Sequence, residues 1–318
     1  MKILTRYIIC ILSVIVIFSS CAGEDIMLYH EKEPEPEPEP QPEYYWLLES
    51  VDYPESNKLE MQSRDDFTLT YNDADSIIII DNDGGDYIRV DYKDKFFSFS
   101  RVRNSSATGR TSDSLLIYLN ENKQIDYALH VTNIETFKDG ELISNRRTQN
   151  DSTVCKYNAE GYMTNMDHYD YSGNNNSLSY AEEYVITDGN ITEVTSSAGY
   201  HHIYTYDKTA YIQSASYVYE MPLNTISIKS RGGCWFMSSL PFLSAKYLGK
   251  ASVNNVSRTV IKKIDRNGVE SDYADIVYKY VLDENNMLST ATLSGAVNGQ
   301  NIPDNYVSKF SHFGKEKK

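Results

Sequence analysis

Cysteine, tryptophan and basic side chains are scarce in this chain of 318 residues. It has 4 Cys and 2 Trp, and 30 Lys and Arg stand against 45 Asp and Glu, which gives a formal net charge of -15. So few cysteines exclude a disulfide-rich scaffold. The negative charge repels nucleic acid, and no basic helix or nucleic-acid motif offsets it, so the sequence predicts no nucleic-acid partner.

Long apolar runs are scarce too. Residues 7–18 form an uninterrupted apolar run that is too short to span a bilayer. Lys2 and Arg6 precede the run and small residues follow it, so we interpret residues 1–20 as an export signal. The rest of the chain has no multi-span membrane signal, and with 41% hydrophobic residues overall we expect it to be globular.

The letters I-F-S-S-C at residues 17–21 resemble a bacterial lipobox, although Phe18 stands where Leu is usual. The resemblance implies that signal peptidase cuts before Cys21 and that its thiol carries a diacylglycerol, which anchors the chain in a lipid bilayer. An ordinary secretory signal is the alternative. Glu24 and Asp25 resemble the surface-export signal of Bacteroidetes lipoproteins, which implies the outer membrane and its exterior face.

Residues 21–43 are predicted to be a tether behind the lipidated Cys. Prolines alternate with Glu and Gln over residues 33–43, which favours an extended polyproline II segment with like charges that repel one another. At Tyr44 the letters Y-Y-W-L-L replace this composition. We therefore expect a single β-rich domain over residues 44–318.

Four stretches of the chain share one pattern. A Tyr-containing run leads into a short group rich in Asn, Asp, Glu or Gly, and a second run with alternating apolar and polar residues follows. Such alternation is typical of half-buried strands, and Asp188-Gly189 supplies the positive φ that a two-residue turn requires. The predicted β-hairpins are residues 118–129, 155–170, 184–195 and 280–291.

These hairpins predict an all-β fold, because one hairpin alone is unstable in water and neighbours pair into a larger sheet. We expect a large antiparallel meander that forms a barrel or a strongly curved sheet. A transmembrane barrel is the alternative. Asp126, Asn165, Asp167 and Glu193 interrupt the apolar band that such a barrel presents to lipid, which favours a soluble, lipid-tethered domain.

Residues 221–264 are basic and contain no Asp or Glu. Lys229, Arg231, Lys246 and Lys250 are candidate contacts for an anionic ligand, and the apolar centre of the segment suits docking on lipid headgroups or an anionic glycan. The plainer interpretation is a connection, or a short helix near residues 234–248, that crosses the sheet and pairs its cations with the protein's own carboxylates.

The candidate metal and nucleophile motifs are weak, and the sequence predicts no cofactor. Residues 81–86 are rich in Asp but lack the EF-hand spacing, and a hairpin turn explains them as well. His201 and His202 are adjacent on a strand, so they point to opposite faces and cannot share a zinc ion by themselves. Cys155 and Cys234 could form a disulfide or remain free thiols.

The lipobox, the tether, the Tyr-rich hairpins and the letters S-S-L-P-F-L at residues 238–243 together resemble an uncharacterised family of Bacteroidetes lipoproteins. The resemblance covers roughly residues 113–313. It implies a domain of unknown function with a porin-like fold, and it supplies no catalytic residues.

Two classes of function fit these observations. The first is a non-enzymatic envelope or cell-surface module that binds a glycan or a protein partner, since the 27 Tyr provide rings with apolar flanks and polar tips. The second is a hydrolase of extracellular polymers that uses paired carboxylates. Among 45 acidic residues the sequence nominates no pair.

Overall fold

The computed structural model describes most of one compact unit, Glu43–Lys318. The predicted signal, Cys21 and the tether lie outside the described residues, as do Cys234, Lys229, Arg231, Lys246 and almost all of the predicted helix at 234–248. The described residues are 44–54, 67–82, 87–93, 95–172, 175–218, 221–222 and 247–316.

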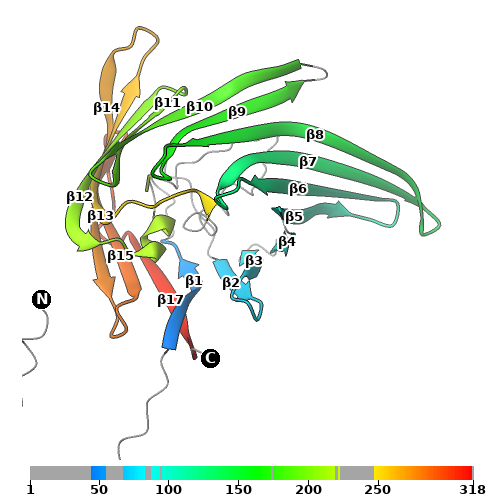
Figure 1. Ribbon diagram of the computed structural model, residues 1–318, viewed down its shortest axis with the longest axis horizontal. Helices are drawn as coiled ribbons and strands as arrows, with labels where there is room; N and C mark the ends of the chain where they lie inside the picture. The colour runs from blue at the N-terminus through cyan, green and yellow to red at the C-terminus, as the bar shows by residue number, and fades with distance from the viewer. Residues whose placement is uncertain are drawn as a thin grey trace, which may run out of the picture. The chain divides into compact units, whose positions relative to one another are not determined.

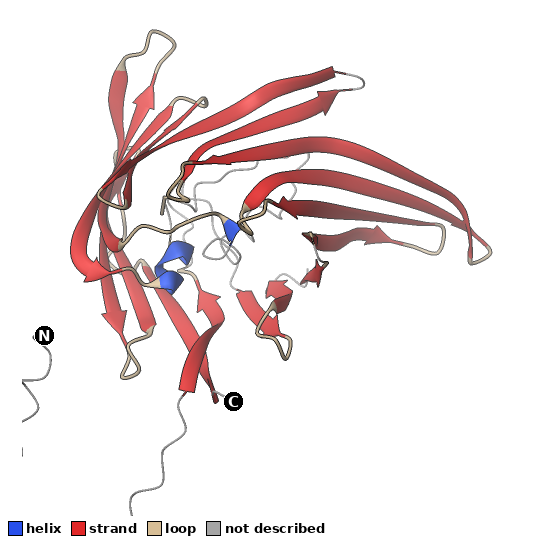
Figure 2. Cartoon of the chain, viewed as in Figure 1, coloured by secondary structure: helices blue, strands red, loops and turns tan. Residues whose placement is uncertain are grey.

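Strand is the dominant structure of the described chain, with η1 as a short 3-10 turn (Figure 2). The elements are β1 (Tyr44–Asp52), β2 (Phe67–Tyr71), β3 (Ile77–Asn82), β4 (Tyr87–Tyr92), β5 (Phe96–Ser105), β6 (Gly109–Leu119), β7 (Ile125–Lys138), β8 (Glu141–Tyr157), β9 (Met163–Ser172), β10 (Asn175–Thr187), β11 (Asn190–Ser196), β12 (Tyr200–Ala210), η1 (Gln213–Tyr217), β13 (Asn254–Ile264), β14 (Glu270–Leu282), β15 (Leu288–Val297), β16 (Gln300–Asn301) and β17 (Val307–Glu316).

The strands form a closed antiparallel barrel. From β2 to β15 each strand pairs with the next one in the chain, so the colours of Figure 1 follow one another around the wall. β17 pairs with both β15 and β1, and β1 pairs with β2 through Ser50 and Val51, which closes the ring. The two-residue β16 pairs with β15 and lies outside the ring of the other sixteen. The all-β prediction is confirmed, and a barrel is the form it takes.

Five hairpin turns share one hydrogen-bond pattern. The side-chain oxygen of the first residue accepts bonds from the backbone N–H groups two and four residues later, and the fourth residue has a positive φ. Asn and Asp favour this position because a short side chain can bond its own turn. The first residues are Asn72, Asn120, Asn158, Asp265 and Asp283.

All four predicted hairpins are confirmed. Three of them contain the shared turn, and the fourth, β10–β11, has φ of 51° at Asp188 and 77° at Gly189. These values match a two-residue turn with both central residues in the left-handed region.

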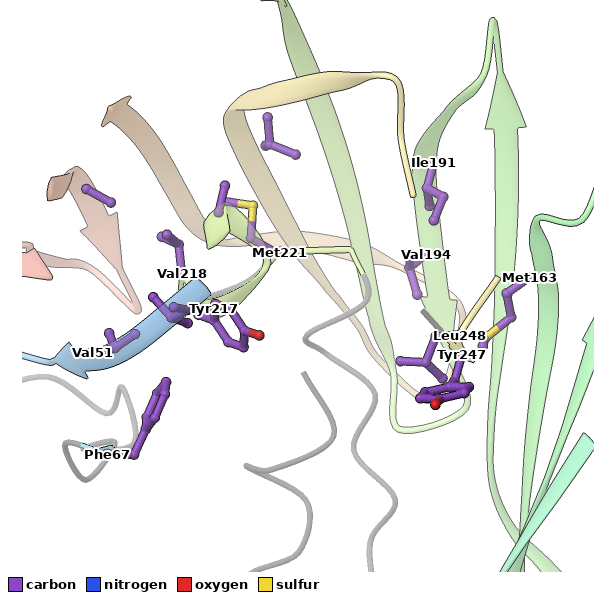
Figure 3. Packing of buried hydrophobic residues seen from close by; sticks show 14 of the residues in the cluster. Val51, Phe67, Met163, Ile191, Val194, Tyr217, Val218, Met221, Tyr247 and Leu248 are labelled. Carbon is purple, nitrogen blue, oxygen red and sulfur yellow. The ribbon is translucent and has the colours of Figure 1, made fainter. Parts of the chain in front are cut away.

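The apolar core lines the inner face of the barrel. In Figure 3, Tyr217 and Val218 lie beside Val51 of β1. The ring of Tyr217 also contacts Phe67, with centroids 5.9 Å apart. Tyr247 packs on Phe97 of β5 at 4.8 Å, so the segments that follow β12 and precede β13 reach the inner side of strands far away in sequence.

Candidate functional site

A pocket of about 450 Å³ lies where β1, β4, β17, η1 and two hairpin turns meet. We call it the aromatic pocket, because six aromatic side chains contribute to its lining. They are Trp46, Tyr71, Tyr92, Tyr211, Tyr217 and Tyr247. A pocket of this size falls within the range of small-molecule sites, roughly 300–1,000 Å³.

Four of the tyrosine hydroxyls that line the pocket are expected to stay neutral at physiological pH. Burial raises the pKa of Tyr71, Tyr92 and Tyr217 well above the ordinary value, and it raises the pKa of Tyr211 to about 12. Tyr71 donates a hydrogen bond of 2.6 Å to the backbone oxygen of Leu48, which fixes its ring across the β1–β2 seam. The rings therefore offer apolar faces together with uncharged polar tips.

The ionisable groups of the pocket leave it with little net charge. Asp75 accepts hydrogen bonds from Lys315 and from the hydroxyl of Tyr45, and these two donors hold the pKa of its carboxyl below the ordinary value. Burial lowers the pKa of His312, whose Nε2 lies 3.1 Å from the hydroxyl oxygen of Ser214. At neutral pH we therefore expect a neutral imidazole beside a carboxylate that is already paired.

Amide and hydroxyl groups complete the polar part of the lining. Gln213 and Ser214 come from η1, Ser76 from the β2–β3 turn and Asn286 from the β14–β15 turn. Such groups both donate and accept hydrogen bonds, so they can orient a ligand that carries hydroxyls.

The outer face of β11–β14 carries charged side chains that pair across strands. Arg258 donates to both carboxylate oxygens of Asp275, at 2.7 and 2.6 Å, and Lys262 pairs with Asp272. The side chains of Arg258 and Asp275 are each 50% exposed, so this pair lies on the surface of the domain. Within the described part of the chain, no helix is long and apolar enough to cross a membrane.

His201 and His202 point to opposite faces, as predicted. On the outer face, His201 Nε2 lies 3.0 Å from Glu193 and Nδ1 lies 2.9 Å from Glu270. His202 is buried. Among the residues that the structure describes, no cluster has the donor set for a metal ion. Of the Asp-rich stretch 81–86, residues 83–86 lie outside the described residues.

Lys250 is the one candidate anion contact that the structure describes. Its ammonium lies 5.4 Å from the ring centroid of Tyr162, and its backbone N–H donates to the oxygen of Gly161 at 2.9 Å. These contacts place it at the β8–β9 turn, and it does not contribute to the lining of the aromatic pocket. Lys229, Arg231 and Lys246 lie outside the described residues, so their predicted role stays a prediction.

Cys155 is a buried free thiol on the inner side of β8. Burial raises its pKa to about 12, so it is unreactive at neutral pH.

Sequence reasoning missed the aromatic pocket. Its lining comes from both ends of the domain, with Trp46 on β1 and His312 on β17. Residues that lie so far apart in the chain leave no local signal that could be read from the sequence alone. The excess of Tyr indicated only that rings would lie on partly solvated surfaces.

Comparisons with known proteins add a likeness in fold. No protein-family model matches the chain. No curated protein matches it either. Among solved structures, the chain is similar to a porin-like protein from Bacteroides uniformis ATCC 8492, with a TM-score of 0.49 and 11% identity over 79% of this chain and 90% of that chain. It is also similar to a porin-like protein from Bacteroides vulgatus ATCC 8482, with a TM-score of 0.48 and 14% identity over 83% of this chain and 97% of that chain. Membership of the lipoprotein family stays a prediction.

Proposed function

We infer that this protein is a lipid-anchored, non-enzymatic module of the bacterial outer membrane that binds a neutral glycan in the aromatic pocket. The observation that carries the inference is the composition of the pocket. Among the described residues that line it, six aromatic side chains lie beside hydroxyl and amide groups, and Asp75, the one carboxylate, is already paired.

A glycan suits this lining for two reasons. Aromatic rings pack against the C–H faces of sugars, while their hydroxyls and the side chains of Gln213 and Asn286 can bond sugar hydroxyls. A neutral glycan is favoured over an acidic one, because burying an anion without a partner costs free energy. The nearby cation, Lys315, already forms an ion pair with Asp75.

Attachment through Cys21 is the second part of the proposal. The lipobox-like letters and the Glu/Pro tether support it, and so does the charged outer face of β11–β14, which suits a barrel wall in water better than one in lipid. Replacing Cys21 by Ser is expected to abolish labelling by radioactive fatty acid. Labelling that persists in this variant would contradict the anchor.

Paired carboxylates would be needed for the hydrolase alternative, with separations of roughly 5–10 Å between the two groups. Among the described residues that line the aromatic pocket, Asp75 has the one carboxyl group. Lys315 and Tyr45 already donate hydrogen bonds to it. Binding without cleavage is therefore the better-supported function for this pocket.

An array of neutral and acidic oligosaccharides, probed with the purified full chain in detergent, tests the proposal. We expect binding to neutral glycans and no release of shorter sugars. Gln213→Ala and Tyr92→Phe remove single polar groups from the pocket and are expected to weaken binding about tenfold, since one hydrogen bond contributes about 1–1.5 kcal/mol.

Tyr127→Phe is the matched control, because Tyr127 lies on the outer face of β7 and does not line the pocket. Binding should be unchanged in this variant. An array that shows no neutral glycan bound, or binding that is indifferent to both pocket variants, would contradict the proposal.

A further inference from the structure

A second group of polar side chains lies inside the barrel, on β6–β9. We call it the inner polar face; its members are Asp113, His130, Thr132, Asp151, Thr153, His168 and Asp170. Strand pairing brings them together, because Asp113 is opposite Thr132, His130 is opposite Asp151, and Asp151 is opposite Asp170. None of them contributes to the lining of the aromatic pocket.

Several of these groups bond one another. His130 Nδ1 lies 2.9 Å from Asp151 Oδ2, and His168 Nδ1 lies 3.0 Å from Thr153 Oγ1. The other nitrogen of His168, Nε2, lies 3.6 Å from Asp170 Oδ1. That distance is too long for a hydrogen bond.

On the inner polar face, Asp151 Oδ1, His168 Nε2 and Asp170 Oδ1 lack a hydrogen-bond partner within the described structure. The side chains of Asp151 and His168 are 0% exposed, whereas that of Asp170 is 22% exposed. Burying a carboxylate without a partner costs more free energy than burying an unpaired neutral polar group. Binding of a cation at this point would therefore be strongly favoured.

The chemistry of the three atoms defines what would fit. When Nδ1 of His168 donates to Thr153, Nε2 becomes an acceptor, and both carboxylate oxygens are acceptors already. Asp151 and Asp170 are directly opposite on paired strands, and Thr153 is directly opposite His168, so the three acceptors belong to one small area of the sheet.

We propose that Asp151, His168 and Asp170 form a second ligand site, which takes a primary ammonium group. Such a group has three N–H donors, one for each acceptor, and its positive charge offsets the two facing carboxylates. The partly exposed side chain of Asp170 marks the side from which the ligand enters.

Thermal unfolding of the full chain tests this site. Methylammonium chloride is the probe, and tetramethylammonium chloride at the same concentration is the control, because it has the same charge but no N–H donor. We expect methylammonium at 100 times its Kd to raise Tm by roughly 5–10 °C relative to the control.

Asp151→Asn and Asp170→Asn are expected to weaken the response to methylammonium at least about tenfold, because each keeps the shape but removes one charge. Asp167→Asn is the matched control: Asp167 lies on the same strand as Asp170 but pairs with Lys156 at 2.8 Å on the outer face. This variant should respond like the unaltered protein. If Asp151→Asn fails to fold, the partly exposed Asp170 carries the test.

Three results would overturn the proposal. The first is an equal effect of the two ammonium salts, and the second is a methylammonium effect that survives both substitutions. The third is the absence of any effect of methylammonium on the unaltered protein, since the carboxylates would then be neutralised from within the chain. All three leave the glycan proposal untouched, because the two sites share no residue.

Discussion

The barrel wall built by β5–β9 and the wall built by β11–β14 differ in how many charged and imidazole side chains they bury on the inner face. In the β5–β9 wall, buried titratable groups such as Asp151 and His168 face inward. On the outer face of this wall, the ring of Tyr118 stacks on Phe96 and Tyr127, with centroids 5.4 and 4.4 Å apart.

The β11–β14 wall has the more apolar inner face. On its inner face Ile261 and Ile276 are fully or almost fully buried, and His202 lies among these apolar side chains. Its outer face carries the Lys262–Asp272 pair and His201, which bonds two glutamates.

The comparison shows that one barrel can combine two kinds of inner face, one mostly apolar and one that also buries ionisable groups. The β11–β14 wall has one buried face and one exposed face, and burial of apolar side chains stabilises it. The β5–β9 wall keeps ionisable groups inside, and burying them stabilises nothing unless they find partners. We therefore expect apolar burial in both walls to stabilise the barrel, since Phe97, Phe99 and Ile117 of the β5–β9 wall are also almost fully buried, and we expect the ionisable groups inside the β5–β9 wall to serve binding.

The largest expected effect on stability is a difference between substitutions on the two faces of β14. Ile276→Ala removes a fully buried side chain and is expected to lower the free energy of unfolding by about 2–4 kcal/mol. Asp275→Ala, one residue earlier on the outer face, should cost less than about 1 kcal/mol. Urea unfolding followed by far-UV circular dichroism measures both. Equal costs would show that the assignment of inner and outer faces is wrong.

A smaller effect contrasts the outer faces of the two walls. Tyr118→Ala removes both ring contacts of the outer stack and is expected to cost about 2 kcal/mol. Arg258→Ala breaks an exposed ion pair on β13 and should cost about 0–1 kcal/mol, with the loss reduced further by salt. Chemical unfolding at low and high salt would separate the two, and a salt-sensitive loss for Tyr118→Ala would contradict this account.

The turns of the two walls differ in their response to acid. Asn158→Ala, in the β8–β9 turn, is expected to cost about 1 kcal/mol at any pH, because it removes two bonds to backbone N–H groups. Asp265 makes the same bonds in the β13–β14 turn, and the N–H groups of Val269 and Asn267 hold its pKa below the ordinary value. Its contribution is therefore present above the unfolded pKa and lost as pH falls through the folded one.

Replacing Asp265 by Asn should accordingly reduce the loss of stability on acidification. Stability at neutral pH should change little. Unfolding midpoints measured from neutral to acidic pH provide the check. An acid limb that does not change would show that this carboxylate is not bonded as described.

The smallest expected effect concerns His201 on the outer face of β12. Burial lowers the pKa of His201, but its hydrogen bonds to Glu270 and Glu193 outweigh burial and raise the pKa above the ordinary value. The stability that it contributes is thus complete below the unfolded pKa and is lost as pH rises through the folded one. We expect His201→Gln to lower stability by a few tenths of a kcal/mol at about pH 5.5 and not at about pH 9.

Double-mutant measurement with Glu270→Gln sharpens this last prediction, since the second substitution should add little once His201 is gone. Additive losses at low pH would contradict the proposed bridge.

Much of the fold could be predicted from sequence because its signals are local. A turn such as that at Asn158 is specified by the residue whose side chain caps it, and the runs on either side alternate. Closure of the ring could not be predicted. It depends on β1 and β17, where Trp46 is opposite Gly314, and nothing near either residue in the chain encodes the other.

The inner polar face could not be predicted for a different reason. In the β7–β8 pair, His130 is opposite Asp151 but Val131 is opposite Gln149, so Asn150 is an extra residue in β8. Such a bulge shifts every later side chain to the other face of the strand. Alternation read along the sequence therefore assigns Asp151 to a face only once the pairing is known.

The central claim, a glycan held in the aromatic pocket, is tested most directly by the fluorescence of Trp46. The chain has 2 Trp, so the Trp235→Phe variant leaves Trp46 as its single reporter, and Trp46 lines the pocket. We predict a saturable change in its emission when a neutral oligosaccharide selected by the array is added, and a loss of that change in the Gln213→Ala variant. Unchanged emission while the same oligosaccharide binds would place the glycan elsewhere and contradict the account.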